Sequence, residues 1–229
     1  KMNRVFDPKA NKVVLGRFGW KSNQPSTRQQ LVGALAGDMG ITSTVKPRPN
    51  CPPAQKACAA WSRHNERHPE ISDADLEAMT LYHYALAIPA PRNTSAPKVM
   101  QGKKLFEVAG CASCHLPDLQ TGTFDPFPAL SNRTIHPYTD LLLHDMGEEL
   151  ADHRPDYLAD GRQWRTPPLW GIGLVTAVNG TLHLMHDGRA RTFLEAILWH
   201  GGEGEYSRNA VRQMNAADRE ALLLFLEAL

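Results

Sequence analysis

Residues 111–115 read Cys-Ala-Ser-Cys-His, and these residue types at this spacing fit one chemistry closely. Two thiols three positions apart can add to the two vinyl groups of a haem, and the histidine that follows then becomes the proximal iron ligand. The other interpretations are a thioredoxin-like redox pair or half of a zinc site. No second C-x-x-C and no βαβ pattern accompanies the motif. The pattern therefore predicts a covalent haem c held by Cys111, Cys114 and His115.

The composition narrows the class of protein. The 229 residues are 42% apolar and carry a net charge of +1, which gives no indication of a nucleic-acid partner or an anionic membrane surface. The longest apolar runs, such as 222–226, are far too short for a membrane span. The first residues do not form a signal peptide, yet haem attachment to this motif takes place outside the cytoplasm. We therefore expect a lost leader and a periplasmic or otherwise exported protein.

The other two cysteines, Cys51 and Cys58, flank a short proline-containing segment. In an oxidising compartment such a pair is expected to form a disulfide, and two free thiols are the alternative. The predicted bridge would staple a loop and has no catalytic role.

The periodicity is helical nearly throughout the chain. Capping residues and apolar spacing predict helices over 28–36, from Ser72 to Leu86, over 98–108, over 192–199 and from Asn215 to the end. In the second helix the apolar residues expected to be buried are Leu76, Met79, Tyr82, Tyr84 and Leu86. Three prolines within 89–97 indicate a linker after it. A short hairpin is expected at 178–181.

The predicted fold is mainly α. A helix that leads through Gly110 into C-x-x-C-H, together with an apolar final helix, is how a small cytochrome c domain begins and ends. We expect such a domain over 94–229, with residues 1–93 forming a separate part that includes the disulfide loop. The paired histidines His64 and His68 have metal-like spacing, but their charged surroundings favour a solvated segment.

The second axial ligand decides whether a haem carries electrons or performs catalysis at an open iron. The candidates are His144, Met146, Met185, His186 and His200. Residues 140–146 are expected to form a short helix. His200 follows a helix and precedes two glycines, which would let the backbone approach a haem closely. Spacing alone does not rank these candidates.

Several longer motifs resemble known haem proteins. The segments 164–171, 184–190 and 194–197 resemble the second haem domain of bacterial di-haem cytochrome c peroxidases. A closer resemblance is to the di-haem oxidoreductase family of peroxidase-like proteins, also labelled thiol oxidoreductases. Its hallmarks are similar to Gly16–Lys21, Tyr138–Gly147 and Ile197–Gly202. The resemblance extends over almost the entire chain.

The resemblance implies roles for particular residues. The distal ligand of the second haem falls on His200, which implies a bis-histidine, low-spin haem that relays electrons and does not bind peroxide; Met146 is the runner-up. Arg165 and Arg189 could clamp haem propionates, because a guanidinium matches a carboxylate, although an exposed ion pair is equally compatible with each.

Three further residues align with a peroxidase series near the first haem. Trp20 takes the place of the tryptophan between the two haems, and Gln30 and Asp38 take the places of pocket residues, where a carboxylate could shuttle a proton. The alternative is a surface tryptophan and an aspartate in a turn. Because the family carries two C-x-x-C-H motifs and this chain has one, we expect the first haem domain to precede residue 1, with 1–93 as its helical tail.

Two functions follow as hypotheses. In the first, the chain is the C-terminal half of a periplasmic di-haem oxidoreductase and relays electrons through Trp20 to or from a catalytic haem outside the chain. In the second, it is a stand-alone mono-haem cytochrome. The partner is a redox protein or a small electron donor or acceptor in either case. The resemblance leaves open whether calcium is a further cofactor and whether the protein is a homodimer.

Overall fold

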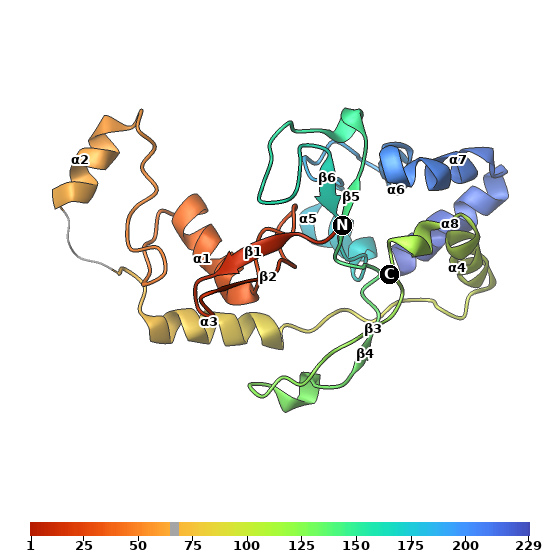
Figure 1. Ribbon diagram of the computed structural model, residues 1–229. Coiled ribbons are helices and arrows are strands. Elements are labelled where there is room, and N and C mark those ends of the chain that lie inside the picture. Colours follow the sequence, from red (N-terminus) through yellow and green to blue (C-terminus); the bar gives the residue numbers. More distant parts are fainter. Residues whose placement is uncertain (65–68) are drawn as a thin grey trace. The chain divides into compact units, whose positions relative to one another are not determined.

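The computed structural model describes residues 1–64 and 69–229 (Figure 1). His68 and the side chain of His64 lie outside the described residues. The chain divides into two compact units. The C-terminal unit contains residues 1–3, 20–22 and 87–229, and the N-terminal unit contains residues 4–19 and 23–86. The predicted assignment of 1–93 and 94–229 to parts of two haem domains stays a prediction.

The N-terminal unit opens with a hairpin that the helical periodicity did not reveal. Strands β1 (Arg4–Asp7) and β2 (Lys12–Leu15) pair antiparallel, with Val5 opposite Val14. The Asp7 carboxylate accepts hydrogen bonds from the backbone of Lys9 and Ala10, which stabilises the turn.

Two capped helices form the core of this unit. The Ser26 and Ser72 hydroxyls cap α1 (Thr27–Asp38) and α3 (Asp73–Ala85), as their sequences predict. The helices pack through Val32, Leu35 and Leu76, and Met79 joins them at the edge. Tyr84 is half-buried. Tyr82 and Leu86 are 64% and 49% exposed, so their predicted burial is wrong: they lie off the narrow stripe that faces α1.

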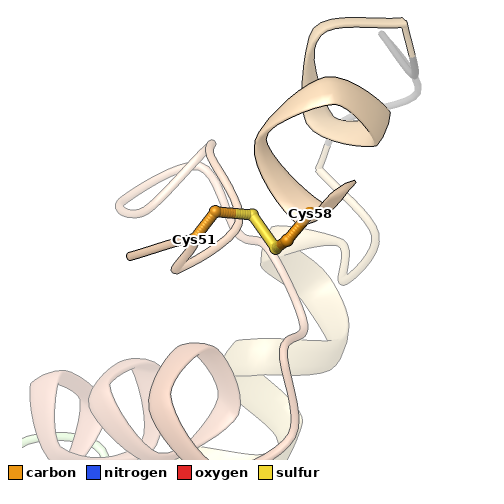
Figure 2. Close-up of a disulfide and its surroundings, with 2 residues drawn as sticks. All are labelled: Cys51 and Cys58. Atoms are coloured by element: carbon orange, nitrogen blue, oxygen red, sulfur yellow. A yellow bond between two sulfur atoms is a disulfide. The ribbon is translucent and has the colours of Figure 1, made fainter. Parts of the chain in front are cut away.

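The predicted disulfide is confirmed. Cys51, in a loop, is bonded to Cys58 in α2 (Lys56–His64), and their Cα atoms are 5.6 Å apart (Figure 2). The bridge therefore ties the start of α2 to the loop that precedes it.

The C-terminal unit is organised around two crossing helices (Figure 1), α4 (Pro97–Val108) and α8 (Ala216–Ala228). Their contact buries Val99, Phe106, Leu222 and Phe225. The crossing is close, because a Cβ on Gly102 would lie 2.0 Å from the carbonyl oxygen of Ala221. Glycine is thus required for this approach of the two backbones.

Short elements fill the sequence between these helices. Two small antiparallel sheets pair β3 (Leu119–Gln120) with β4 (Thr134–Ile135), and β5 (Leu143–Asp145) with β6 (Gln163–Arg165). The remaining helices are α5 (Val175–Asn179), α6 (Phe193–Leu198) and α7 (Glu205–Gln213). The chain is therefore mainly α, with strands only two to four residues long in the described ranges.

Two predicted elements are wrong. Residues 140–146 form no helix: Leu141 has a φ of 59°, the Asp140 carboxylate accepts from the Leu142 amide, and the chain then enters β5. Pairing with β6 thus overrides the local helical pattern. The hairpin expected at 178–181 is instead the end of α5, where Gly180 adopts the left-handed conformation that closes a helix.

None of the helices in the described ranges combines the length and the apolar character that crossing a membrane requires.

Candidate functional site

A cavity of about 330 Å³ lies within the C-terminal unit. Most of its wall is apolar, with Phe106, Leu150, Leu169, Leu222 and Leu226 among the contributors. The wall also carries both cysteines of the C-x-x-C-H motif and every candidate axial ligand: His115, His144, Met146, Met185, His186 and His200. The fold thus gathers at one cavity these cysteines and candidate ligands, which are up to 89 positions apart in the sequence (111 to 200).

The motif enters the cavity wall at the end of α4. Gly110 adopts a φ of 80°, which turns the chain into a 3₁₀ turn over Cys111–Ser113. The Cys111 and Cys114 thiols are free and partly buried. Burial raises the pKa of the Cys111 thiol to about 11. A reactive thiol pair needs a lowered pKa, so this environment argues against the thioredoxin-like interpretation.

His115 is partly buried, and its ring is held by the backbone. Its Nδ1 lies 2.9 Å from the carbonyl oxygen of Tyr138, which can only accept, so Nδ1 carries the proton and Nε2 is left with its lone pair. Desolvation lowers the pKa of the imidazole to about 4, although the Tyr138 carbonyl opposes this shift. His115 is therefore neutral at physiological pH, the form that ligates a metal.

His200 repeats the same arrangement from another element. It follows α6, whose N-terminus is capped by Thr192, and its Nδ1 donates to the carbonyl oxygen of Ala196 at 2.7 Å. Burial lowers its pKa, against the effect of the Ala196 carbonyl. His200 thus also presents a neutral ring with a free Nε2.

The glycines after His200 let two chain segments touch. A Cβ on Gly202 would lie 2.2 Å from the Asp145 carbonyl oxygen, and one on Gly201 would lie 2.8 Å from the Met146 carbonyl oxygen. The Glu203 carboxylate accepts from the Asp145 amide at 3.0 Å. Since this segment follows His200, its close packing holds the two leading candidates for the distal ligand, His200 and Met146, in one fixed relation.

His144 is engaged differently. Its Nε2 lies 2.7 Å from the Asp140 carboxylate and its Nδ1 lies 2.7 Å from the Glu203 carboxylate. Hydrogen bonds that the ring makes to the Asp140 carboxylate and to the Cys114 sulfur raise the pKa of His144 to about 10, and its hydrogen bond to Glu203 adds to this shift. A ring with both nitrogens donating to carboxylates has no lone pair left for iron, so the geometry disfavours His144 as an axial ligand.

The two arginines have different surroundings. Arg165 lines the cavity, where desolvation lowers its pKa, and its Nη1 lies 3.4 Å from the Thr166 carbonyl oxygen. Arg189 is outside the described cavity wall: its guanidinium binds Asp187 and the Glu149 carbonyl and covers the Trp199 ring at 4.6 Å.

The predicted peroxidase-type residues fall in different units. Trp20 lines the cavity and is 51% exposed. Gln30 and Asp38 lie on α1 of the N-terminal unit with exposed side chains, and their predicted roles stay predictions.

Sequence reasoning missed a stacked group in the same wall. The Trp164 and His186 rings stack with centroids 3.6 Å apart, and the Lys21 ammonium lies 4.5 Å from the centroid of the Trp164 ring. The position of Lys21 directly after Trp20 was the one local signal for it.

Comparison with protein families assigns the chain to a known family. The family model described as "Di-haem oxidoreductase, putative peroxidase" matches residues 1–229. The chain belongs to this family. Family membership implies a haem cofactor and a redox role.

Two other comparisons add little. No curated protein matches the chain significantly. A structure of hydrazine synthase from Kuenenia stuttgartiensis, pressurised with xenon, is similar at 20% identity with a TM-score of 0.43. The match covers 77% of this chain and 62% of the hydrazine synthase chain.

The residues of the cavity fit a haem. Two free thiols, two neutral imidazoles with free Nε2 atoms and a largely apolar wall form the donor set that a covalent haem requires. In the described ranges, no group of three or more His, Cys, Asp or Glu side chains is arranged to hold a bare metal ion.

Proposed function

We propose that the chain is the c-type cytochrome module of a di-haem oxidoreductase and that its one haem, attached to Cys111 and Cys114, relays single electrons. His115 and His200 are the residues that would hold its iron. The observation that carries this assignment is the pair of Nδ1 hydrogen bonds to backbone carbonyls, at 2.9 Å and 2.7 Å, which leave both Nε2 atoms free in one cavity.

The chain's own residues define the chemistry. When bound, a haem supplies one-electron chemistry at its iron. The Tyr138 and Ala196 carbonyls fix the tautomer and orientation of the two imidazoles, as outer partners of metal-ligating histidines do. The largely apolar wall offers few polar partners to water. If both imidazoles held the iron, they would leave no position open to peroxide, and the site would serve electron relay rather than peroxide chemistry.

Two cavity residues support the relay. Arg165 provides a desolvated cation suited to a haem propionate. Trp20 lines the cavity and is half exposed, so one electron can pass between the cavity and an outside redox partner by way of its indole.

An exported location agrees with the disulfide. A Cys51–Cys58 bridge persists in an oxidising compartment, which is also where haem is attached to C-x-x-C-H. We therefore propose a periplasmic or otherwise exported protein.

The ligand assignment is tested by a pair of variants. His200→Gly should convert the haem from low-spin to high-spin and allow it to bind carbon monoxide or cyanide, because one axial position opens. Met146→Ala serves as the matched control and should leave the optical spectrum low-spin. If Met146→Ala opens the site and His200→Gly does not, the distal ligand is Met146.

The single C-x-x-C-H motif favours a second candidate function, a stand-alone mono-haem electron carrier. Pyridine haemochrome analysis and peroxide turnover of the full-length gene product separate the two candidates. Two haems with turnover support the di-haem oxidoreductase; one haem with reversible low-spin redox behaviour and no turnover supports the carrier.

A further inference from the structure

The tripeptide Trp20–Ser22 is inserted in the C-terminal unit, although the residues on both sides of it belong to the N-terminal unit. Ser22 is 1% exposed and has a φ of 50°, a conformation that disfavours a residue with a side chain. Such backbone strain persists only where surrounding contacts hold the conformation in place, and strained residues are found most often at functional sites.

Hydrogen bonds fix this backbone on both sides of Lys21. The Arg165 amide donates to the Trp20 carbonyl at 2.8 Å, and the Asn3 amide group donates to the Lys21 carbonyl at 2.8 Å. The Ser22 hydroxyl donates to the Leu141 carbonyl at 3.2 Å. All three partners belong to the C-terminal unit, so the tripeptide is held by the same unit that forms the cavity.

The Lys21 side chain supplies the strongest anchor. Its side chain is 6% exposed, and Nζ lies 2.6 Å from the Asp152 carboxylate, 2.6 Å from the Arg154 carbonyl and 3.0 Å from the Asp160 carbonyl. Three acceptors match the three protons of an ammonium group. A buried ammonium group whose three N–H donors are all bonded is held in one place. Moving it would leave a desolvated charge without hydrogen-bond partners, which is energetically costly.

The same ammonium adjoins the aromatic part of the cavity wall. It lies 4.5 Å from the Trp164 ring centroid, a cation–π contact, while His186 stacks on that indole with an interplanar angle of 11°. The Trp164 Nε1 donates to the Leu150 carbonyl at 2.9 Å. Trp20, Trp164 and His186 all line the cavity. Lys21 therefore joins the segment that carries Trp20 to a wall that is fixed by its own contacts.

We propose that Lys21 is a positioning residue that holds the Trp20 indole in the cavity wall at the distance electron transfer requires. This inference rests on the proposed function. In the step concerned, one electron leaves an external one-electron reductant and reduces the group in the cavity, and no bond or proton changes place. Because the rate depends on the placement of the indole, loosening its anchor slows the transfer without removing any redox group.

The test compares Lys21→Met with Lys98→Met in the haem-loaded full chain. Methionine keeps an apolar stem and removes the ammonium, and the Lys98 ammonium forms a surface pair with Glu220 at 2.8 Å that makes a matched control. One readout is Trp20 emission, obtained by subtracting the matching Trp20→Phe variant. The other is the stopped-flow rate of reduction by hexaammineruthenium(II), compared at equal haem content and unchanged low-spin spectrum.

Lys21→Met should raise Trp20 emission severalfold, as the indole moves away from the quenching haem, and slow reduction about tenfold. Lys98→Met should change neither. Asp152→Asn removes one of the three acceptors and should shift both readouts less but in the same direction, which covers the case in which Lys21→Met does not fold. Lys21→Arg should restore part of the rate.

The outcomes separate the two proposals. If Trp20→Phe slows reduction while Lys21→Met and Asp152→Asn leave emission and rate unchanged, the positioning role is overturned and the relay stands. If Trp20→Phe leaves the rate unchanged, the relay through Trp20 fails, and a rise in Trp20 emission in Lys21→Met still supports Lys21 as its anchor.

Discussion

The two side chains of the Lys21–Asp152 ion pair differ in their exposure to solvent. The ammonium side chain is 6% exposed and the carboxylate side chain is 31% exposed. Burial tends to raise the pKa of Asp152, but hydrogen bonds from Lys21 and the Arg154 amide outweigh it, and the pKa lies below its ordinary value of 3.8. Losing the carboxylate is therefore harmful mainly because it leaves a desolvated cation without its anionic partner.

Asp152→Asn should lower the free energy of unfolding by about 2 kcal/mol at neutral pH. A carboxylate with a lowered folded-state pKa stabilises the fold above its unfolded-state pKa, near 3.8, and this stabilisation is lost as the pH falls through the folded-state value. The difference between the wild-type and variant chains in denaturant unfolding should thus be constant from neutral pH down to about pH 5 and shrink below pH 4. A difference that grows on acidification would contradict the argument.

Gly202→Ala should destabilise the chain by about 3 kcal/mol, because its Cβ would lie 2.2 Å from the Asp145 carbonyl oxygen at a φ of 52°. Gly180→Ala is the matched control: its φ of 76° is equally unfavourable, but no atom lies within 4 Å of the added methyl group. That variant should lose only about 1 kcal/mol. Equal losses in denaturant unfolding would mean that the contact between residues 145–147 and 201–204 is not tight.

At the residue scale, the sequence predicts chemistry that depends on neighbouring residues, but it does not predict which distant residues are partners. Cys-Ala-Ser-Cys-His predicts haem attachment because its members are adjacent. The geometry that disfavours His144 as a ligand depends on Glu203, 59 residues away. The environment of Lys21 depends on Asp152, 131 residues away, so no window of sequence could reveal it.

At the element scale, alanine substitutions at two helical glycines should change the stability of the fold in opposite directions. Gly102→Ala should destabilise the crossing of α4 and α8 by about 2 kcal/mol, because the methyl group would lie 2.0 Å from the Ala221 carbonyl oxygen. Gly37→Ala, in α1 with open space around its Cβ position, should stabilise by about 0.5–1 kcal/mol through helix propensity. Denaturant unfolding of both variants checks the signs; stabilisation by Gly102→Ala would contradict the close crossing.

The elements that the sequence predicts correctly are those with local signals. Helices capped by Ser26, Ser72, Thr192 and Asn215 begin where their caps stand, because the capping interaction lies within three residues. The pairing of β5 with β6 joins residues 143–145 to 163–165, and local propensity carries no information about it. The β1–β2 hairpin has a local signal in Asp7-Pro8, a dipeptide that favours a turn, although the chain's periodicity is mostly helical.

At the scale of the whole molecule, the disulfide and the cavity belong to different units. Replacing both Cys51 and Cys58 by serine frees a short loop and should destabilise the N-terminal unit by about 2 kcal/mol. The haem spectrum and the reduction potential of the loaded chain should remain unchanged. Protease sensitivity mapped by mass spectrometry should rise within 23–86 and stay constant within 97–229; a change in the haem spectrum would contradict this separation.

The placement of Trp20–Ser22 in the C-terminal unit has a consequence for how the chain becomes folded. The contacts of Lys21 with residues 152–160 close loops of more than 130 residues, and such long closures form late. During synthesis, Trp20–Ser22 can make these contacts only after residues near 160 have been added, so this part of the cavity wall is completed late. For the same reason a fragment starting at Ala87 would keep every residue that we propose to bind the haem, yet it would leave Asp152 without its lysine and one face of Trp164 uncovered.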